Sequence, residues 1–272
     1  MRLIQRGAII ISVPLTTIFG YSTYEALQIS KNVKIPQNEA ITLYQYKICP
    51  FCNKVKAVLD FMDIKYHQIE VNPLTKQELT HLGEYKKVPV AQIDGKVIGE
   101  SGAIIASILN TAAKNSSQSH FNDNFLSSNS TFWMEWCDKS LAVLLYPNIT
   151  RTFDESWECF SYTEDVKTWT TLMRYSNRLL GPVAMYFVNS KLKKKYGIVD
   201  ERAELRALLN EWTAAVGNKP FLNGKEATIP DIVVFGVIKS IENTQTFRYI
   251  MEDVVLREWY NRVVALMPRA SC

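Results

Sequence analysis

The spacing of apolar residues changes along the chain from strand periodicity to helical periodicity. Short apolar runs at 41–46, 64–71, 88–93 and 96–99 predict four strands, and helical spacing occurs at 47–62, 76–82 and 100–112. Asp94-Gly95 is typical of a two-residue hairpin turn between the last two strands. The order β-α-β-α-β-β-α predicts an α/β thioredoxin-like domain of the glutaredoxin type, which we place at residues 40–113.

The second half of the chain has helical periodicity throughout. Residues 114–130 are rich in Ser and Asn and predict a linker, after which residues 131–272 predict an all-α domain. We expect helices near 131–146, 164–180, 182–196, 200–216, 229–243 and 250–266. One apolar stripe on the first of them consists of Trp133, Trp136, Leu141, Leu144 and Leu145.

An uncharged segment, residues 7–24, precedes both domains and is followed by a polar linker. A helix needs ~20 apolar residues to span a bilayer. We therefore expect residues 1–34 to be an N-terminal hydrophobic helix that anchors the protein to a membrane through residues 7–24. An organelle-targeting segment and a helix docked on the protein are the alternatives.

Composition and charge limit the possible partners of the protein and the compartment in which it works. The chain has 272 residues, 47% of them hydrophobic and 21% charged, with a net charge of +4. This mild charge excludes a typical nucleic-acid binder. The dense cluster of Lys191, Lys193, Lys194 and Lys195 indicates a solvated helix end, with a membrane-surface contact as the alternative. Five cysteines, an odd number, favour a reducing compartment over a secreted disulfide framework.

The strongest chemical signal is Cys49-Pro50-Phe51-Cys52, where a predicted strand ends and a helix begins. Free N–H groups and the helix dipole lower the pKa of a thiol at that position. The pKa of Cys49 should be lowered more than that of Cys52, because Cys52 lies one turn inside the helix. A zinc site would need a second Cys/His pair nearby, and none is apparent, so we assign no metal ligands. Two inert cysteines packed at a helix start are the other alternative.

Two further elements accompany the cysteines. Val88-Pro89 opens a strand, and a cis bond there would present the Val88 backbone to a peptide ligand, whereas an ordinary proline at a strand start is equally consistent. Glu100-Ser101 opens a helix. It is either a simple N-cap or a site in which Ser101 holds a peptide carboxylate and Glu100 holds an ammonium group.

These three elements together resemble the glutathione site of the glutaredoxin and glutathione-transferase superfamily. Longer segments, among them LYQYKICPFCNKV, EYKKVPV, GPVAMYFVNSKLKKKYGI and TIPDIVVFG, resemble the membrane-associated prostaglandin E synthase type 2 family. The resemblance covers about 41–264. It places Tyr46, Cys49, Phe51 and Cys52 on the active-site motif, and Val88, Pro89, Glu100 and Ser101 on the glutathione-binding elements, with Phe51 also lining the ligand cleft.

The resemblance implies glutathione as cofactor, haem as a second ligand, a homodimer, and isomerisation of the endoperoxide prostaglandin H2 to prostaglandin E2 through a Cys49 or glutathione thiolate. The acidic residue before the serine is commonly Asp in the family but is Glu100 here. A member that binds no haem is an alternative. We expect the anchor to lie in a mitochondrial or endoplasmic reticulum/Golgi membrane, with the catalytic domains in a reducing compartment.

Two other functions stay open from the residues. The C-x-x-C pair is sufficient for glutaredoxin-like thiol–disulfide exchange, with Cys49 attacking and Cys52 resolving. A non-catalytic, glutathione-transferase-like subunit of a membrane complex would also have an intact fold and an anchor. If isomerase activity depends on glutathione, the prostaglandin isomerisation is favoured over thiol–disulfide exchange.

Overall fold

Four strands form one mixed sheet in the computed structural model, which describes residues 41–115 and 128–267. The strands are β1 (Ile41–Gln45), β2 (Tyr66–Glu70), β3 (Val90–Ile93) and β4 (Lys96–Gly99), in the spatial order β2-β1-β3-β4. β1 runs parallel to β2 and antiparallel to β3. Asp94 and Gly95 both have positive φ, 48° and 69°, as a two-residue hairpin turn requires.

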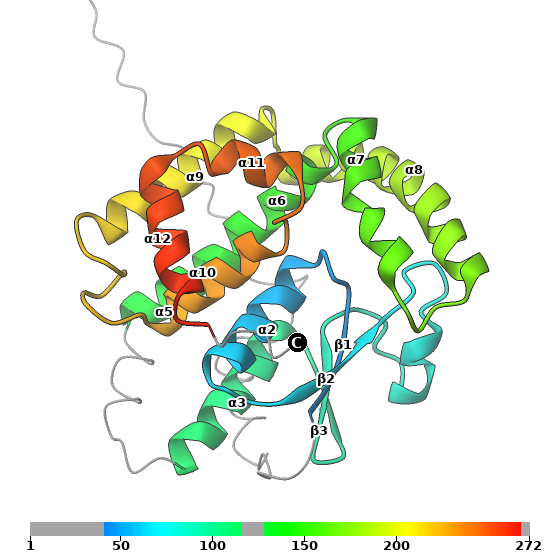
Figure 1. The fold of residues 1–272 in the computed structure, drawn as a ribbon, viewed down its shortest axis with the longest axis horizontal. Helices are drawn as coiled ribbons and strands as arrows, with labels where there is room; N and C mark the ends of the chain where they lie inside the picture. The colour runs from blue at the N-terminus through cyan, green and yellow to red at the C-terminus, as the bar shows by residue number, and fades with distance from the viewer. Residues whose placement is uncertain (1–40, 116–127, 268–272) are drawn as a thin grey trace, which may run out of the picture.

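Alternating side chains of the strands contact helices on opposite faces of the sheet. Leu43 points into the main core with α2 (Pro50–Phe61) and α3 (Ser101–Asn115), whereas Tyr44 packs in a smaller cluster with Leu79 of the 3-10 helix η1 (Gln77–Leu82). Figure 1 shows the sheet below α2, with the helical part above it. This arrangement agrees with the predicted thioredoxin-like α/β order.

The rest of the described chain is helical. Its elements are α5 (Ser128–Trp136), the π-helical stretch η2 (Cys137–Leu141), α6 (Ala142–Ile149), α7 (Phe153–Cys159), the 3-10 helix η3 (Ser161–Asp165), α8 (Thr171–Tyr196), α9 (Glu201–Val216), α10 (Ile229–Lys239), α11 (Gln245–Ile250) and α12 (Val254–Val264). The predicted apolar stripe, from Trp133 to Leu145, is buried in the main core.

The predicted break between helices 164–180 and 182–196 is wrong, because α8 runs through Gly181-Pro182 without interruption. An internal proline removes one helical hydrogen bond, but tertiary contacts outweigh that loss here. Asn177 donates to Asn72 Oδ1 at 3.2 Å, and Asn189 donates to the Thr150 carbonyl at 2.7 Å. The sequence did not predict the short helices α7 and α11. They have seven and six residues, which is too few for a recognisable helical periodicity.

The two parts meet where α10 packs on α2, the helix that carries the cysteines (Figure 1). Gly236 of α10 lies directly against the α2 backbone. At the start of α10, Thr228 and Asp231 form a capping box. The fully buried Asp231 carboxylate also accepts from the Trp259 indole at 3.0 Å, which ties α10 to α12.

The prediction of a single N-terminal membrane anchor is corrected here. Across residues 41–115 and 128–267, no helix combines the length and the apolar character that crossing a bilayer requires. The 26-residue α8 has the length, but it carries the lysine cluster at its end. Residues 1–34, on which the hydrophobic helix and the contact through residues 7–24 were predicted, lie outside the described residues.

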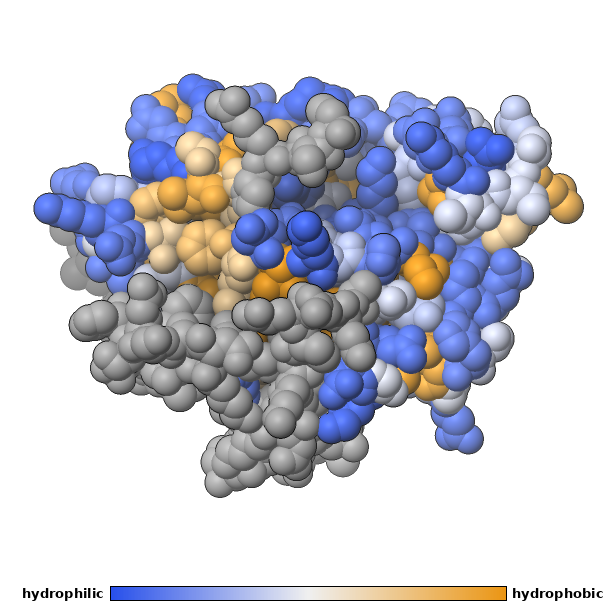
Figure 2. Space-filling view, turned by 60° about the horizontal axis from the view of Figure 1, so that its bottom comes forward, coloured by the Kyte–Doolittle hydropathy of each residue, from blue (hydrophilic) through white to orange (hydrophobic). Residues whose placement is uncertain are grey.

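Hydrophilic residues dominate the face shown in Figure 2, with apolar residues gathered in one area toward its left.

The lysine cluster lies at the end of α8, where the sequence predicts a solvated helix end. Lys191 and Lys194 are exposed, and Lys193 forms an ion pair with Glu201. Ammonium groups at this end also interact favourably with the negative end of the helix dipole, which stabilises the last turn of α8.

Candidate functional site

The cysteine pair lies at the N-terminus of α2. Cys49 has extended backbone (φ −79°, ψ 120°) and occupies the N-cap position, and Pro50 begins the helix. The Cys49 carbonyl accepts from the backbone N–H of Cys52 at 3.1 Å and of Asn53 at 3.0 Å. The Asn53 side chain donates to the same carbonyl at 2.9 Å and to the Lys47 carbonyl at 2.7 Å, so it fixes the loop that presents Cys49.

The two thiols differ in burial and in pKa. Cys49 is half-buried, and its pKa is lowered, first by a hydrogen bond from the Cys52 thiol and then by backbone N–H groups and the positive charge of Lys56. Cys52 is fully buried, and burial raises its pKa well above that of an ordinary thiol. Cys49 is therefore the more readily ionised of the two thiols, in the direction expected at a helix N-terminus.

Alkylation against pH checks this difference. We expect Cys52→Ser to keep a fast-reacting thiol whose midpoint lies below that of free cysteine, and Cys49→Ser to react slowly at every pH, because Cys52 is buried and protonated. The buried Cys137 and Cys159 remain in both variants, so they contribute the same background. Equal reactivity of the two variants would contradict the assignment of Cys49 as the thiolate.

Tyr46 lies just before the cysteine loop and is half-buried. Burial raises its pKa above that of an ordinary phenol, and the nearby Cys49 and Cys52 raise it further. The phenol therefore stays protonated beside the thiolate and is available as a hydrogen-bond donor. Phe51 packs partly against the main core, with the Lys54 ammonium 5.7 Å from its ring centroid, so its predicted part in lining the ligand cleft stays a prediction.

The Val88-Pro89 bond is cis, as the first of the two sequence alternatives predicts. Within the described ranges, the N–H and C=O of Val88 make no hydrogen bond, since β3 pairs with its neighbours only from Val90 onward. The antiparallel register sets Val90 opposite Tyr44, so the chain before β3 runs beside the loop after β1. A peptide backbone can therefore add to Val88 next to Cys49.

Glu100 occupies the N-cap position of α3 and has a left-handed backbone, with φ of 66°. Non-glycine residues in this region are uncommon and gather at functional sites. The Tyr85 hydroxyl donates to the Glu100 carboxylate at 2.8 Å, and Ser101 is buried at the first position of the helix. Tyr85 was missed by sequence reasoning, because only the folded chain shows which side chain reaches Glu100.

The sheet register brings the three elements together. Tyr44 near the end of β1 pairs with Val90 at the start of β3, and Val90 pairs with Gly99 at the end of β4. The segments that contain Cys49, Pro89 and Glu100 therefore leave the sheet at the same edge. This edge combines a thiol of lowered pKa, an unpaired backbone segment and a carboxylate beside a helix N-terminus, and these groups are suited to binding a peptide with free termini.

Glu70, at the end of β2, is a second group that sequence reasoning missed. Burial raises its pKa from the ordinary 4.5 to about 7, although its carboxylate accepts from the Lys47 N–H and from the Gln45 side chain, both at 2.8 Å. Because the folded-state pKa is raised, the stabilisation is complete below about pH 4.5 and is lost as the pH rises through about 7.

We therefore expect the wild type to lose about 1–2 kcal/mol of folding free energy from this group between pH 5 and pH 8, after allowance for partial exposure. Glu70→Gln should flatten that dependence, whereas the exposed Glu84→Gln should retain it. Thermal unfolding at the two pH values measures the effect. Identical pH dependence in wild type and Glu70→Gln would contradict it.

The histidines do not support a haem site. His67 is exposed on β2, the His81 ring is hydrogen bonded to the Tyr44 hydroxyl at 3.0 Å, and His120 lies outside the described residues. Within the ranges that the structure describes, no group of three His, Cys, Asp or Glu side chains could hold a metal ion. The haem that the resemblance implies stays a prediction.

Comparison with known proteins agrees with this geometry. The family model of the glutathione S-transferase N-terminal domain matches residues 43–116. Prostaglandin E synthase 2 of Danio rerio is 28% identical over 295 residues, which cover 90% of this chain and 78% of that protein. Glutaredoxin 1 of Rickettsia conorii is 35% identical over 68 residues, covering 24% of this chain and 67% of that protein.

A solved structure shows the same fold. The glutathione S-transferase of Ceriporiopsis subvermispora, in complex with glutathione, aligns with a TM-score of 0.54 and 15% identity over 84% of this chain and 98% of that chain. The resemblance inferred from the motifs agrees with these comparisons. This chain contains a glutathione S-transferase N-terminal domain at residues 43–116 and is similar to prostaglandin E synthase 2 over most of its length.

Proposed function

We propose that this protein binds glutathione at the sheet edge beside Cys49 and isomerises a lipid endoperoxide of the prostaglandin H2 type to the corresponding hydroxyketone. The observation that carries the proposal is the half-buried Cys49 thiol with a lowered pKa, next to the unpaired Val88 backbone. Similarity to prostaglandin E synthase 2 over most of the chain supports the reaction type.

Each binding group has a role that follows from its position. The Val88 N–H and C=O pair with the peptide backbone of glutathione, and Pro89 fixes their direction. Ser101 and the N–H groups that begin α3 hold a carboxylate, since a helix N-terminus favours an anion. Glu100, oriented by Tyr85, holds the ammonium group. When bound, glutathione supplies a second thiol beside Cys49.

The chemistry needs a soft nucleophile and a proton donor. The Cys49 thiolate attacks one oxygen of the weak O–O bond, so an S–O bond forms and the O–O bond breaks. The other oxygen leaves as an alkoxide, which takes a proton from Tyr46. The Tyr46 phenolate then takes the proton from the carbon that bears the S–O oxygen, which forms the ketone, expels the Cys49 thiolate and restores the Tyr46 phenol. The carbon is oxidised, the peroxide is reduced, and no external oxidant is required.

An isomerase assay with prostaglandin H2 tests this function. We expect activity that rises on addition of glutathione and falls at least about a hundredfold in Cys49→Ser, because a serine hydroxyl is not ionised at neutral pH. Cys52→Ser is the matched control. It should keep most of the isomerase activity, because the mechanism uses one thiolate. Wild-type activity that equals the rate without protein would reject the proposal.

Glutaredoxin-like thiol–disulfide exchange is a second candidate. Similarity to glutaredoxin 1 and the hydrogen bond from the Cys52 thiol to Cys49 favour it. A dithiol mechanism needs Cys52 to resolve the mixed disulfide, so Cys52→Ser should abolish reduction of a protein disulfide. Loss of disulfide reduction together with retained isomerase activity in that variant would assign both reactions. The lipid substrate and the homodimer stay predictions.

A further inference from the structure

A polar cavity lies on the flank of α2, between that helix, β2 and the end of α10, and the glutathione proposal does not use it. Its volume is about 170 Å³, and its lining includes Asn53, Lys56, Asp60, Tyr66, Gln68 and Lys239. Pockets for drug-sized ligands are usually about 300–1,000 Å³, so this cavity suits a small ion with a few waters.

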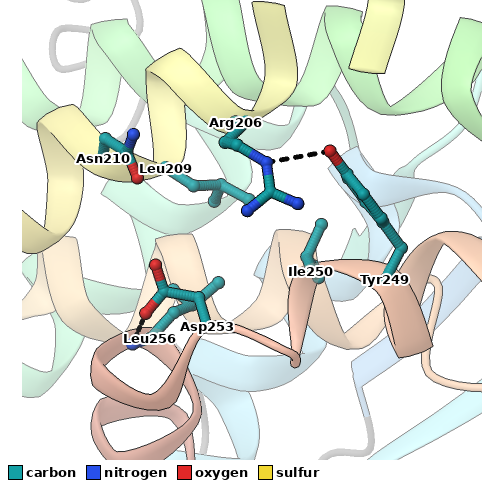
Figure 3. A pocket seen from close by; sticks show the side chains of 7 residues that line it. All are labelled: Arg206, Leu209, Asn210, Tyr249, Ile250, Asp253 and Leu256. Atoms are coloured by element: carbon teal, nitrogen blue, oxygen red, sulfur yellow. Dashed lines mark hydrogen bonds between the residues drawn. The ribbon is translucent and has the colours of Figure 1, made fainter. Parts of the chain in front are cut away.

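The cavity in Figure 3 is different in kind. It lies between α9, α11 and α12, and its volume of about 10 Å³ has room for one water. Arg206 donates to the Tyr249 hydroxyl there at 2.9 Å, so its charged side chain already has a partner. Of these two cavities in the described part of the chain, the one beside α2 combines room for a ligand with ammonium groups that form no ion pair.

Two ammonium groups line the cavity beside α2, and neither forms an ion pair with the cavity's one carboxylate, Asp60. Neither Lys56 nor Lys239 forms an ion pair or hydrogen bond with any described residue, although both are partly buried. Lys239 lies 5.5 Å from the Phe235 ring centroid, an arrangement that compensates little of its charge. The cavity's own carboxylate, Asp60, accepts a hydrogen bond from the Tyr66 hydroxyl at 2.9 Å.

The neutral groups of the lining leave one further donor. The Asn53 amide nitrogen donates to the Cys49 and Lys47 carbonyls. The Gln68 amide oxygen accepts a hydrogen bond from Gln45 at 3.4 Å. The Gln68 amide nitrogen makes no hydrogen bond with a described residue and is the remaining donor. Burial lowers the pKa of Lys56, and the carboxylates that oppose this shift are Glu70 and then Asp60. Glu70, with a pKa of about 7, is only partly ionised at neutral pH. The balance of charge therefore stays positive.

We infer that this cavity binds a small oxyanion of the phosphate class, held by Lys56, Lys239 and the Gln68 amide. Ammonium groups act as point charges for phosphate, and a tetrahedral oxyanion offers enough acceptors for three donors at once. Inorganic phosphate and the phosphate group of a small monoester share this chemistry.

Occupancy of the cavity has a consequence for the thiol. Lys56 lies one helical turn beyond Cys52, and its positive charge is one of the causes that lower the pKa of Cys49. An oxyanion that neutralises Lys56 would weaken this effect, so the Cys49 thiol would be less ionised at neutral pH. The site therefore couples anion binding to the reactivity of the thiolate.

Calorimetric titration with inorganic phosphate and with glycerol phosphate, at fixed ionic strength in chloride, tests the inference. We expect saturable binding of one equivalent and a rise in the pH midpoint of Cys49 alkylation at saturation. If both ligands bind, the site recognises the phosphate group itself. If only one binds, the site distinguishes free phosphate from a phosphate monoester. Either result supports the site. Heat no larger than that of a matched chloride titration would overturn it.

Variants locate the binding. Lys239→Met keeps the apolar stem against Phe235 and removes the charge, and Gln68→Glu adds a negative charge at an exposed position, so both should fold. We expect each to weaken phosphate binding at least about tenfold, the loss of roughly one charge-assisted hydrogen bond. Lys191→Met, at an exposed position on α8, is the matched control and should bind as wild type. Equal weakening in all three variants, or in none, would contradict a site in this cavity.

Discussion

Gly236→Ala should lower the free energy of unfolding by at least about 3 kcal/mol. A Cβ at this position would lie 2.6 Å from the Lys54 Cα and 2.7 Å from the Asn53 carbonyl oxygen. Overpacking against movable side chains costs about 1–3 kcal/mol, and here the obstructing atoms belong to the backbone of α2. The helices must move apart, and the gain in helix propensity, about 1 kcal/mol, does not compensate.

Thermal unfolding measures the loss, which corresponds to a fall of about 6–12 °C in Tm for a chain of this size. Gly102→Ala is the matched control, because Gly102 is also helical but a Cβ there meets nothing within 4 Å. We expect that variant to be unchanged or slightly stabilised. Because α2 carries Cys49, Gly236→Ala should also slow alkylation of that thiol. A Gly236→Ala variant as stable as wild type would show that α10 and α2 separate easily.

Asp138→Ala should destabilise the fold by about 3 kcal/mol, whereas Lys54→Met should be close to neutral. Lys54 is 1% exposed and pairs with Asp138, which is 34% exposed and belongs to the π-helical stretch η2. Removing the carboxylate leaves a buried ammonium group without its partner, which commonly costs about 3–5 kcal/mol, and the partial exposure of Asp138 places the expected loss at the lower end. Methionine at position 54 preserves the packing and removes the charge that needs compensation.

Denaturant unfolding of the two single variants and the double variant separates these terms. We expect Lys54→Met to rescue Asp138→Ala, because the double variant has no buried charge left. Lys139→Met is a matched control, since its ion pair with Glu135 is exposed and should contribute less than about 1 kcal/mol. Equal destabilisation by Asp138→Ala and Lys54→Met would mean that the pair itself, rather than an unpaired charge, governs stability.

Much of the candidate site could be predicted because its signals are local. A strand followed by C-P-F-C places a thiol at a helix N-terminus, whatever the rest of the chain does. Asp94-Gly95 fixes the hairpin that brings Glu100 back beside Pro89. The capping box of Thr228 and Asp231 likewise lies within four residues. In each case the controlling interaction spans only a few positions.

The sequence by itself determined the order of strands and helices, the position of the cysteines, and the resemblance to a family. Only the tertiary structure decided that Lys54 is buried against Asp138, that Tyr85 holds Glu100, and that α8 continues through Pro182. The structure confirms the expected difference between the thiols, since Cys52 is buried and Cys49 is half-buried. Periodicity reports which face of an element is apolar, but the partner that covers that face comes from distant segments, and its contacts outweigh local preference.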